Sequence, residues 1–488
     1  MVLTKLNHFL DNIIYDPVNG RILYDLTICL MSTVAIFFTL AYFKLPVTNF
    51  FIPIYYSLAL LLINIVFGLY GKYKTSSFSR KLIIIFGSNF IAYLLFLTIF
   101  NNYLLFTLFF TSSFTITILP RFFLNFNVER ITLKRVSVNN KENPILIVGG
   151  GGYIGSVLVE KLLKKGEKVR VFDKFVYSKD VFKKIKNSNN LEIMEGDISD
   201  IYSLTLAVKD SKAIVHLAGI VGDPAAKLDE DLTRHVNIAS TRLLKETAKS
   251  FGIKKFIFAS SCSVYGATNK LQNETSKPNP ISLYANTKVD SEKELLSDRA
   301  DNFHPVILRF ATVFGHSRKP RFDLVANLFV AEAFNNRLIK VYGGEQWRPF
   351  IHVTDIAEAI IKVLEAPEEI VSRQIFNVGD DAMNIRIDNL ATTVKEIIGD
   401  PKIKIEIIKN QKDNRSYRVS FKKINTVLGF TSSISLEKGV KEIYKNFLTK
   451  KYKKNYKNSY YVNYEMTKQL RKEFRTKKYR KSHFSTIS

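Results

Sequence analysis

The sequence predicts an α/β protein with a doubly wound parallel sheet and a smaller C-terminal subdomain, preceded by four transmembrane α-helices. Long uncharged apolar runs occupy most of residues 26–120 in a chain of 488 residues. A β-branched strand at Ile145–Val148 then runs into four consecutive glycines and an amphipathic helix. Beyond that helix, short apolar strands alternate with helical patterns to about residue 448, which is typical of a parallel sheet.

The membrane domain is predicted from three runs without a charged residue, at Leu26–Phe43, Leu45–Gly71 and Leu82–Pro120. About 20 helical residues cross a bilayer core of about 30 Å. The third run is too long for one span at about 1.5 Å per residue, and Asn101 and Asn102 mark a turn at its middle. Within residues 1–122 we therefore expect four spans, at about 26–43, 50–70, 82–100 and 103–119.

The orientation follows from the basic loops. Four basic residues lie between the second and third spans and four more lie at 121–135, whereas the other two loops hold only Lys44. The positive-inside rule then predicts a protein of the cytoplasmic (inner) membrane, with both termini and everything after residue 120 in the cytoplasm. The two cysteines, Cys29 and Cys262, fit such a reducing compartment.

A dinucleotide site is predicted directly after a linker at 123–143. Gly149, Gly152 and Gly155 allow a tight turn, close approach of the backbone to a pyrophosphate, and close helix packing. The helix that follows offers free N–H groups to the phosphates. A second strand ends in Asp173, whose carboxylate can accept both ribose hydroxyls and would repel the 2′-phosphate of NADP. We therefore expect NAD as the cofactor of a Rossmann-type half.

Further short motifs follow in a specific order: Gly196-Asp197-Ile198, His216-Leu217-Ala218-Gly219, Asn237, Phe258-Ala259-Ser260-Ser261, Val264-Tyr265-Gly266, Tyr284-Ala285-Asn286-Thr287-Lys288, and Arg348-Pro349-Phe350-Ile351-His352-Val353. With these motifs, a domain at about 144–448 resembles the extended short-chain dehydrogenase/reductase family, in its branch of nucleotide-sugar epimerases and dehydratases. The resemblance implies a nucleotide-sugar substrate and a homodimer. It also implies that NAD is bound by Gly149, Gly152, Tyr153, Ile154, Gly155, Asp173, Asp197, Ile198, Leu217, Ala218, Gly219 and Lys288.

The catalytic residues are predicted from one helix and one strand. Tyr284 and Lys288 are four residues apart and share one helix face. A nearby ammonium favours the phenolate, so the tyrosine can remove a hydroxyl proton from the substrate. Ser261, at the end of a strand, can hydrogen-bond the reacting oxygen and relay the proton. Ser261 and Tyr284 are thus expected both to bind the substrate and to take part in proton transfer.

The reaction is narrowed by the two residues after Ser261. The family's 4,6-dehydratases carry an Asp-Glu pair there, but this sequence has Cys262 and Ser263. We therefore favour 4-epimerisation through a 4-keto intermediate over elimination of water. A 4-keto reductase or a dehydrogenase remains an alternative. A non-catalytic NAD-binding scaffold and a lipid-alcohol dehydrogenase are more distant ones.

The substrate half is expected beyond about residue 315. By the resemblance, Asn327 and Arg348 hold the diphosphate. Arg415 and Arg418 are further, weaker candidates for the same role. A guanidinium fork suits a diphosphate because it donates two parallel hydrogen bonds. No metal site is expected, since no cluster of carboxylates or cysteines has metal-ligand spacing.

The N-terminal spans loosely resemble those of membrane-bound nucleotide-sugar dehydratases of polysaccharide biosynthesis, through Leu69-Tyr70 and Leu119-Pro120-Arg121. That likeness implies a setting in surface polysaccharide biosynthesis. A basic tail at 449–488 closes the sequence, with 13 lysines and arginines between residues 450 and 488. We expect this tail to lie on anionic lipid, with a solvated tail as the alternative and nucleic acid as an improbable partner.

Overall fold

The computed structural model describes residues 143–483, except residues 178, 186–187, 298–302, 410–412 and 453–454. The four predicted spans lie outside the described residues and stay predictions. None of the described helices is both long enough and apolar enough to cross a bilayer. The described residues belong to one unit of the chain, Ser137–Ser488.

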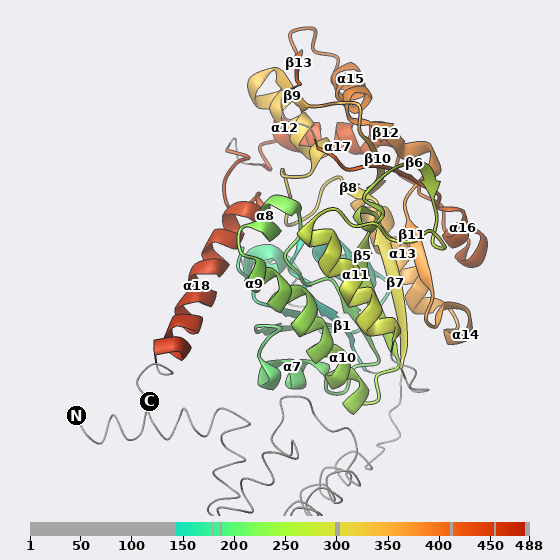
Figure 1. The fold of residues 1–488 in the computed structure, drawn as a ribbon, viewed down its shortest axis with the longest axis vertical. Helices are drawn as coiled ribbons and strands as arrows, with labels where there is room; N and C mark the ends of the chain where they lie inside the picture. The colour runs from blue at the N-terminus through green and yellow to red at the C-terminus, as the bar shows by residue number, and fades with distance from the viewer. Residues whose placement is uncertain are drawn as a thin grey trace, which may run out of the picture. The chain divides into compact units, whose positions relative to one another are not determined.

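A seven-stranded parallel sheet in the order β11-β7-β5-β4-β1-β2-β3 forms the centre of this unit (Figure 1). Its strands are β1 (Ile145–Val148), β2 (Val169–Asp173), β3 (Leu191–Glu195), β4 (Ala213–His216), β5 (Lys255–Ser261), β7 (His304–Phe310) and β11 (Ile375–Val378). The chain builds outward from β1 to β3, then returns to the other side of β1 with β4. This reversal leaves a crevice at the carboxyl ends of the strands, and the predicted doubly wound sheet is confirmed.

Helices cover both faces of the sheet because its strands are apolar on both sides. Along β1, Ile145 and Ile147 pack with one helical layer, whereas Leu146 and Val148 pack with the other. Successive strand side chains point to opposite faces, so a continuous apolar strand needs two covers. The first layer has α6 (Tyr153–Lys164) and α13 (Val353–Glu365), and the second has α7 (Ile201–Val208), α10 (Ser240–Ser250) and α11 (Leu283–Leu296).

A smaller C-terminal subdomain stands above the carboxyl edge of the sheet (Figure 1). Its apolar core is shared by α12 (Val325–Asn336), α15 (Ile387–Ile398) and α17 (Leu436–Leu448). The short sheets here and at its border are β12-β10-β8, β13-β9 and β14-β6. Their strands are β6 (Ala267–Gln272), β8 (Thr312–Phe314), β9 (Leu338–Tyr342), β10 (Trp347–His352), β12 (Asn384–Arg386), β13 (Lys404–Ile408) and β14 (Ser416–Val419).

The remaining helical segments are short and lie mostly in connections. They are η1 (Lys179–Phe182), α8 (Asp223–Lys227), α9 (Glu230–Arg234), η2 (His235–Ala239), η3 (Cys262–Tyr265), α14 (Glu368–Val371), η4 (Asp381–Met383) and α16 (Lys422–Leu428). The segment η2 is a π turn that joins α9 to α10.

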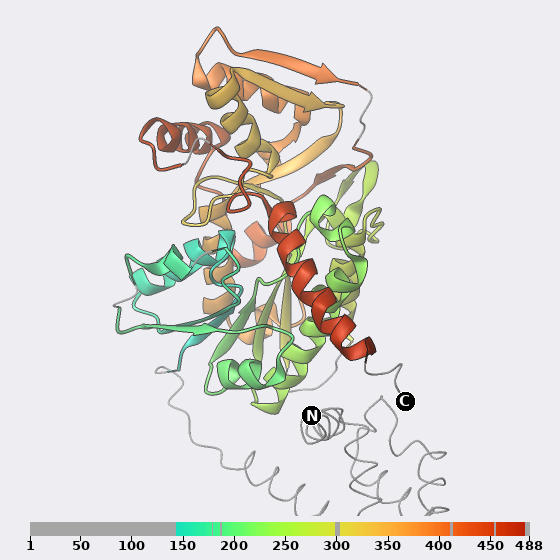
Figure 2. The same ribbon diagram turned by 90° about the vertical axis from the view of Figure 1, so that its left-hand side faces the viewer.

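Part of the basic tail packs on the domain, which the sequence analysis did not predict, and its contact with anionic lipid stays a prediction. Tyr452, Tyr456 and Tyr461 are buried in the core of the C-terminal subdomain. The helix α18 (Asn463–His483) then runs alongside α8 (Figure 2). The tyrosine rings between the lysines of this segment provide apolar surface that can be buried against the subdomain. The number of charged residues alone did not indicate this packing. The expected domain boundary at residue 448 therefore does not mark the end of the packed structure.

A buried ion pair joins α11 to the sheet. The carboxylate of Glu292 on α11 accepts hydrogen bonds from Arg309 Nε and Nη2 of β7, at 3.0 and 2.6 Å. It also accepts a hydrogen bond from the hydroxyl of Ser260 at the end of β5. Both charged side chains are 4% exposed or less. Arg309 Nη1 donates to the Tyr265 hydroxyl at 3.0 Å, so the network extends to the segment after β5.

We predict that Arg309→Met lowers the free energy of unfolding by about 3–5 kcal/mol, because it leaves the Glu292 carboxylate buried without its counter-ion. The double variant Glu292→Leu/Arg309→Met recovers much of that loss. Arg170→Met is the matched control, since Arg170 pairs with the half-exposed Glu192 at the surface. Denaturant unfolding of the four proteins checks this, and an equal loss in Arg309→Met and Arg170→Met would contradict it.

Candidate active site

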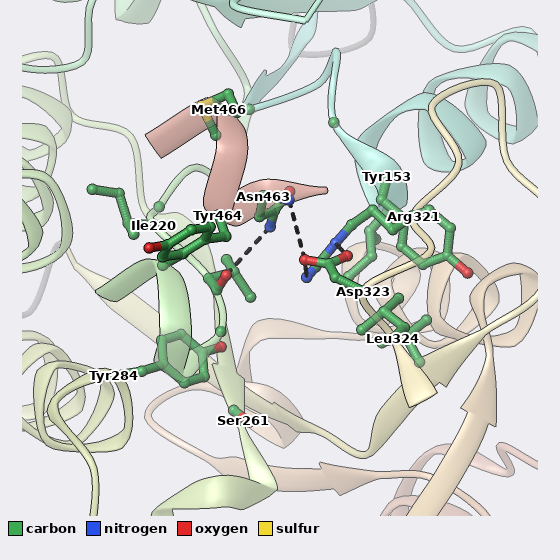
Figure 3. Close-up of a pocket in the computed structure, with 18 of the residues that line it drawn as sticks. Tyr153, Ile220, Ser261, Tyr284, Arg321, Asp323, Leu324, Asn463, Tyr464 and Met466 are labelled. Atoms are coloured by element: carbon green, nitrogen blue, oxygen red, sulfur yellow. Dashed lines mark hydrogen bonds and ion pairs between the residues drawn. The ribbon is translucent and has the colours of Figure 1, made fainter. Parts of the chain in front are cut away.

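A cavity of about 1180 Å³ opens at the carboxyl ends of the strands. It is lined by the loops after the strands β1, β2, β3, β4, β5 and β7, by α11, by the C-terminal subdomain, and by the first turns of α18. Figure 3 shows Tyr284 and Ser261 on one side, with Asn463, Tyr464 and Met466 entering from α18. Every residue that the sequence predicted for the site lines this cavity except Asn327 and Arg418. Arg418 instead donates to the Asn269 carbonyl at 3.0 Å.

The glycine-rich turn between β1 and α6 fits a dinucleotide. Gly149 has φ +85°, and a Cβ there would lie 2.6 Å from the backbone nitrogen of Ala218. A Cβ at Gly155 would lie 2.5 Å from the carbonyl oxygen of Gly149. Gly152 caps α6 without a side chain, so the N-terminal N–H groups of the helix lie next to the cavity that Gly152 lines. Such a turn can receive a pyrophosphate at the helix N-terminus.

Asp173 ends β2 at the edge of the same cavity. Its Oδ2 accepts from the Gly151 N–H at 2.9 Å and its Oδ1 from the Phe175 N–H at 2.7 Å. Each carboxylate oxygen keeps a further lone pair for a ribose hydroxyl. Burial raises the pKa of Asp173, while the backbone donors act in the opposite sense. Next to it, Asp197 forms an ion pair with Lys174 at 3.2 Å. These residues fit the adenosine half of NAD.

The structure brings the three predicted catalytic side chains together. Tyr284 and Lys288 lie on one face of α11, and Ser261 ends β5. The side chains of Tyr284 and Ser261 both line the cavity, and Ser261 lowers the pKa of the Tyr284 phenol. The Lys288 ammonium donates to the carbonyl oxygen of Ala259 at 2.7 Å and lies 5.9 Å from the centroid of the Tyr284 ring. Their arrangement suits proton removal from a hydroxyl held between Tyr284 and Ser261.

Burial dominates the acid–base properties of these groups. It raises the pKa of the Tyr284 phenol, whereas the Ser261 hydrogen bond and the Arg321 charge lower it. Burial also lowers the pKa of Lys288 to about 8, although the negative charge of Glu292 acts to raise it. At pH 7 Lys288 is still mostly protonated, so its positive charge favours the phenolate of Tyr284.

Asn237 holds the cofactor loop against the catalytic helix. It lies in the π turn η2, and such turns are often found at functional sites. Its Oδ1 accepts from the Ile220 N–H at 2.8 Å, and its Nδ2 donates to the Ile220 carbonyl and to the Thr287 hydroxyl, both at 3.0 Å. The sequence singled out Asn237 by resemblance only, because its role depends on contacts with residues far along the chain.

The predicted diphosphate residues separate into two groups. Arg348 and Arg415 line the cavity, and both bind Asp413, at 2.7 and 2.5 Å. Arg415 also forms an ion pair with Asp223. The Asn327 amide instead contacts Gly315 N, the Tyr153 hydroxyl and the Arg321 carbonyl, at 3.0, 3.2 and 2.8 Å. These contacts place Asn327 behind the cavity wall, and its contact with a diphosphate stays a prediction.

Several cavity residues carry no signal in the sequence. Arg321 forms a two-pronged ion pair with Asp323, at 2.9 and 3.0 Å, and lowers the pKa of Tyr284. The ammonium of Lys319 lies 3.6 Å from the centroid of the Tyr177 ring, and burial lowers its pKa to about 7. Neither residue belongs to a motif with known spacing, so only the fold reveals them.

Residues 145–379 match the model of the NAD dependent epimerase/dehydratase family. A Bacillus subtilis protein named an uncharacterized UDP-glucose epimerase is 32% identical over 236 residues, which are 46% of this chain and 73% of that protein. A UDP-glucuronate 4-epimerase of Thermodesulfobacterium geofontis is 29% identical over 310 residues, or 61% of this chain and 93% of that protein. The chain belongs to this family, and it is an NAD-dependent enzyme.

Solved structures agree on the fold. A UDP-glucose 4-epimerase of Thermotoga maritima, solved with UDP-glucose, covers 63% of this chain and 100% of its own, with a TM-score of 0.57 and 27% identity. A UDP-glucuronic acid 4-epimerase of Bacillus cereus, solved with UDP-glucuronic acid and NAD, has a TM-score of 0.58 over 63% of this chain and all of its own. Its 24% identity supports the fold alone.

We predict that Tyr284→Phe keeps NAD binding but lowers turnover by at least about 10²-fold, because the base that takes the hydroxyl proton is lost. Tyr342→Phe is the matched control, since it removes a phenol from the cavity lining on β9. Cofactor titration and initial rates check both variants. Retained turnover in Tyr284→Phe would remove this residue from the mechanism.

Proposed function

We propose that the protein is an NAD-dependent nucleotide-sugar 4-epimerase that works through a 4-keto intermediate. The observation that carries the proposal is that Tyr284, Lys288 and Ser261 come together on the wall of a cleft that fits NAD. Relatives named UDP-glucuronate 4-epimerase and UDP-glucose 4-epimerase support the substrate class. The cavity has room for a cofactor and a nucleotide sugar together.

The protein's residues supply proton transfer and orientation. NAD, when bound, takes the hydrogen of carbon 4 with its electron pair and later returns it. Tyr284 removes the proton of the 4-hydroxyl and gives it back after the keto sugar has turned its other face. Ser261 holds the reacting oxygen, and the Lys288 charge favours the phenolate. Arg348 and Arg415, on the subdomain side, are the proposed partners of the diphosphate.

Elimination of water is disfavoured by the residues after Ser261. Cys262 is 1% exposed, its thiol contacts the Arg309 carbonyl at 3.2 Å, and burial raises its pKa. The Ser263 hydroxyl is buried as well. Neither group can both protonate a leaving hydroxyl and remove the proton of carbon 5 near pH 7. The chemistry therefore stays at carbon 4.

Proton NMR of sugar stereochemistry tests the proposal. Full-length protein in detergent is incubated with NAD⁺ and UDP-, dTDP- and GDP-linked sugars, with Tyr284→Phe as the control. The proposal predicts conversion of at least one sugar to its 4-epimer without net NADH. Accumulation of NADH with a keto or acid product would instead establish a dehydrogenase.

We also propose that residues 1–120 anchor the enzyme in the cytoplasmic membrane, where it would serve surface polysaccharide biosynthesis. The support is the sequence: four uncharged apolar segments and basic loops on one side. A homodimer is part of the same expectation, through the family resemblance.

Carbonate extraction tests the anchor. The full chain should stay in the membrane pellet at high pH, because four spans bury far more apolar surface than a peripheral contact. Neutralising the basic tail from residue 477 onward should not release it. Release of the unaltered chain by carbonate alone would contradict four spans.

A further inference from the structure

The segment that follows α17 lies across the cavity. It begins well beyond residue 379, where the family match ends. Asn463, Tyr464, Met466, Leu470, Glu473 and Phe474 all line the cavity. Figure 3 shows Tyr464 on the side toward Ile220 and Tyr284, whereas Asn463 is joined to Asp323. We infer that residues 455–476 are a built-in cover of the cofactor site, which holds NAD in place between α18 and the edge of the sheet.

Asn463 fixes the start of the cover to three separate segments. Its Oδ1 accepts from the Tyr177 hydroxyl, in the loop after β2. Its Nδ2 donates to the Val221 carbonyl after β4 at 3.3 Å, and its N–H donates to Asp323 Oδ2 at 3.2 Å. The first two segments border the cofactor, and the third borders the substrate half. One residue thus joins both halves of the site, through its side chain and its backbone N–H.

The chain before Asn463 is held just as firmly. The Tyr461 carbonyl accepts from the Phe322 N–H at 3.0 Å. The Tyr460 carbonyl accepts from the buried ammonium of Lys319, which also lies over the Tyr177 ring. The cover therefore supplies a carbonyl partner to an amine that is 1% exposed and whose other carbonyl contact, with Pro320, is longer at 3.4 Å.

Apolar side chains of the cover pack on the segment that follows β4. Leu470 and Phe474, one helical turn apart, pack on a small buried cluster of Ile220, Ala225 and Leu232. The Phe474 ring lies 5.4 Å from the His235 ring, centroid to centroid. Such a contact removes part of two large side chains from water and connects the helix to α8 and α9.

The ion pairs of Glu473 and Arg475 hold the far end, where Arg471 also lies 3.5 Å from Asp229. Glu473 binds Lys174 at 2.8 Å, and Lys174 also binds Asp197, which is expected to flank the adenine. Arg475 binds Asp229 at 2.9 Å. The cover thus reaches from the sugar end of the cavity to the adenosine end, so bound NAD can leave only if α18 lifts. For an epimerase, on the proposed function, this retention keeps the reduced cofactor paired with its keto sugar between the two hydrogen transfers.

The release rate of NADH tests the cover. Full-length protein in detergent is loaded with NADH, then chased with excess NAD⁺ while cofactor fluorescence is followed. Leu470→Asp/Phe474→Asp should speed release by at least about tenfold, equivalent to about 1.4 kcal/mol. The matched control, Gln469→Asp/Thr476→Asp, adds the same charges at exposed positions of α18 and should leave the rate within about twofold.

A second variant guards against misfolding. Glu473→Gln/Arg475→Gln removes both ion pairs, leaves the apolar contact intact, and should speed release by about threefold at low salt only. Unchanged release in a folded Leu470→Asp/Phe474→Asp protein, or in this second variant if the first does not fold, overturns the cover. The assay uses no sugar, so it does not depend on the proposed function. If NADH release depends on the cover but the protein does not epimerise any sugar, only the proposed function is rejected.

Discussion

The buried ion pair between Glu292 and Arg309 is the contact on which the site depends most. Tyr284, Lys288 and Glu292 follow one another at four-residue steps along α11, so the pair fixes the rotation of the helix that carries both catalytic side chains. Through Ser260 the same carboxylate is bonded to the residue next to Ser261. A buried carboxylate needs its partners, and here those partners align helix and strand. Its charge also limits how far burial depresses the pKa of Lys288.

The sequence predicted the parallel sheet and the cofactor cradle well because both depend on local patterns. Gly149 and Gly155 are needed where a Cβ would collide with backbone, and Asp173 ends a strand that apolar residues define. The Tyr284–Lys288 spacing was equally informative, since helix geometry alone puts the two on one face. Such features are encoded within about 30 residues of chain.

Long-range contacts could not be predicted in the same way. Arg321 and Lys319 belong to no motif, and their positions depend on packing against Tyr177 and Asp323. The packing of the tail was missed for a related reason: its charge suggested a lipid surface, whereas Tyr452, Tyr456 and Tyr461 are buried in the subdomain and Phe474 packs, partly buried, on Ile220. Asn327 was assigned to the diphosphate by resemblance alone. In the structure its side-chain amide hydrogen-bonds Gly315 and Tyr153. The membrane spans remain predictions from residues outside the described part.

Isotope tracing tests the central claim most directly, that one site oxidises and re-reduces the same carbon. UDP-glucuronate and UDP-glucose carrying deuterium at carbon 4 would be incubated with the full-length enzyme in ordinary water, and the product analysed by NMR. The account predicts a 4-epimer that keeps its deuterium at carbon 4, because the cofactor returns the hydrogen that it received. Loss of that deuterium to solvent, or inversion at another carbon, would contradict the account.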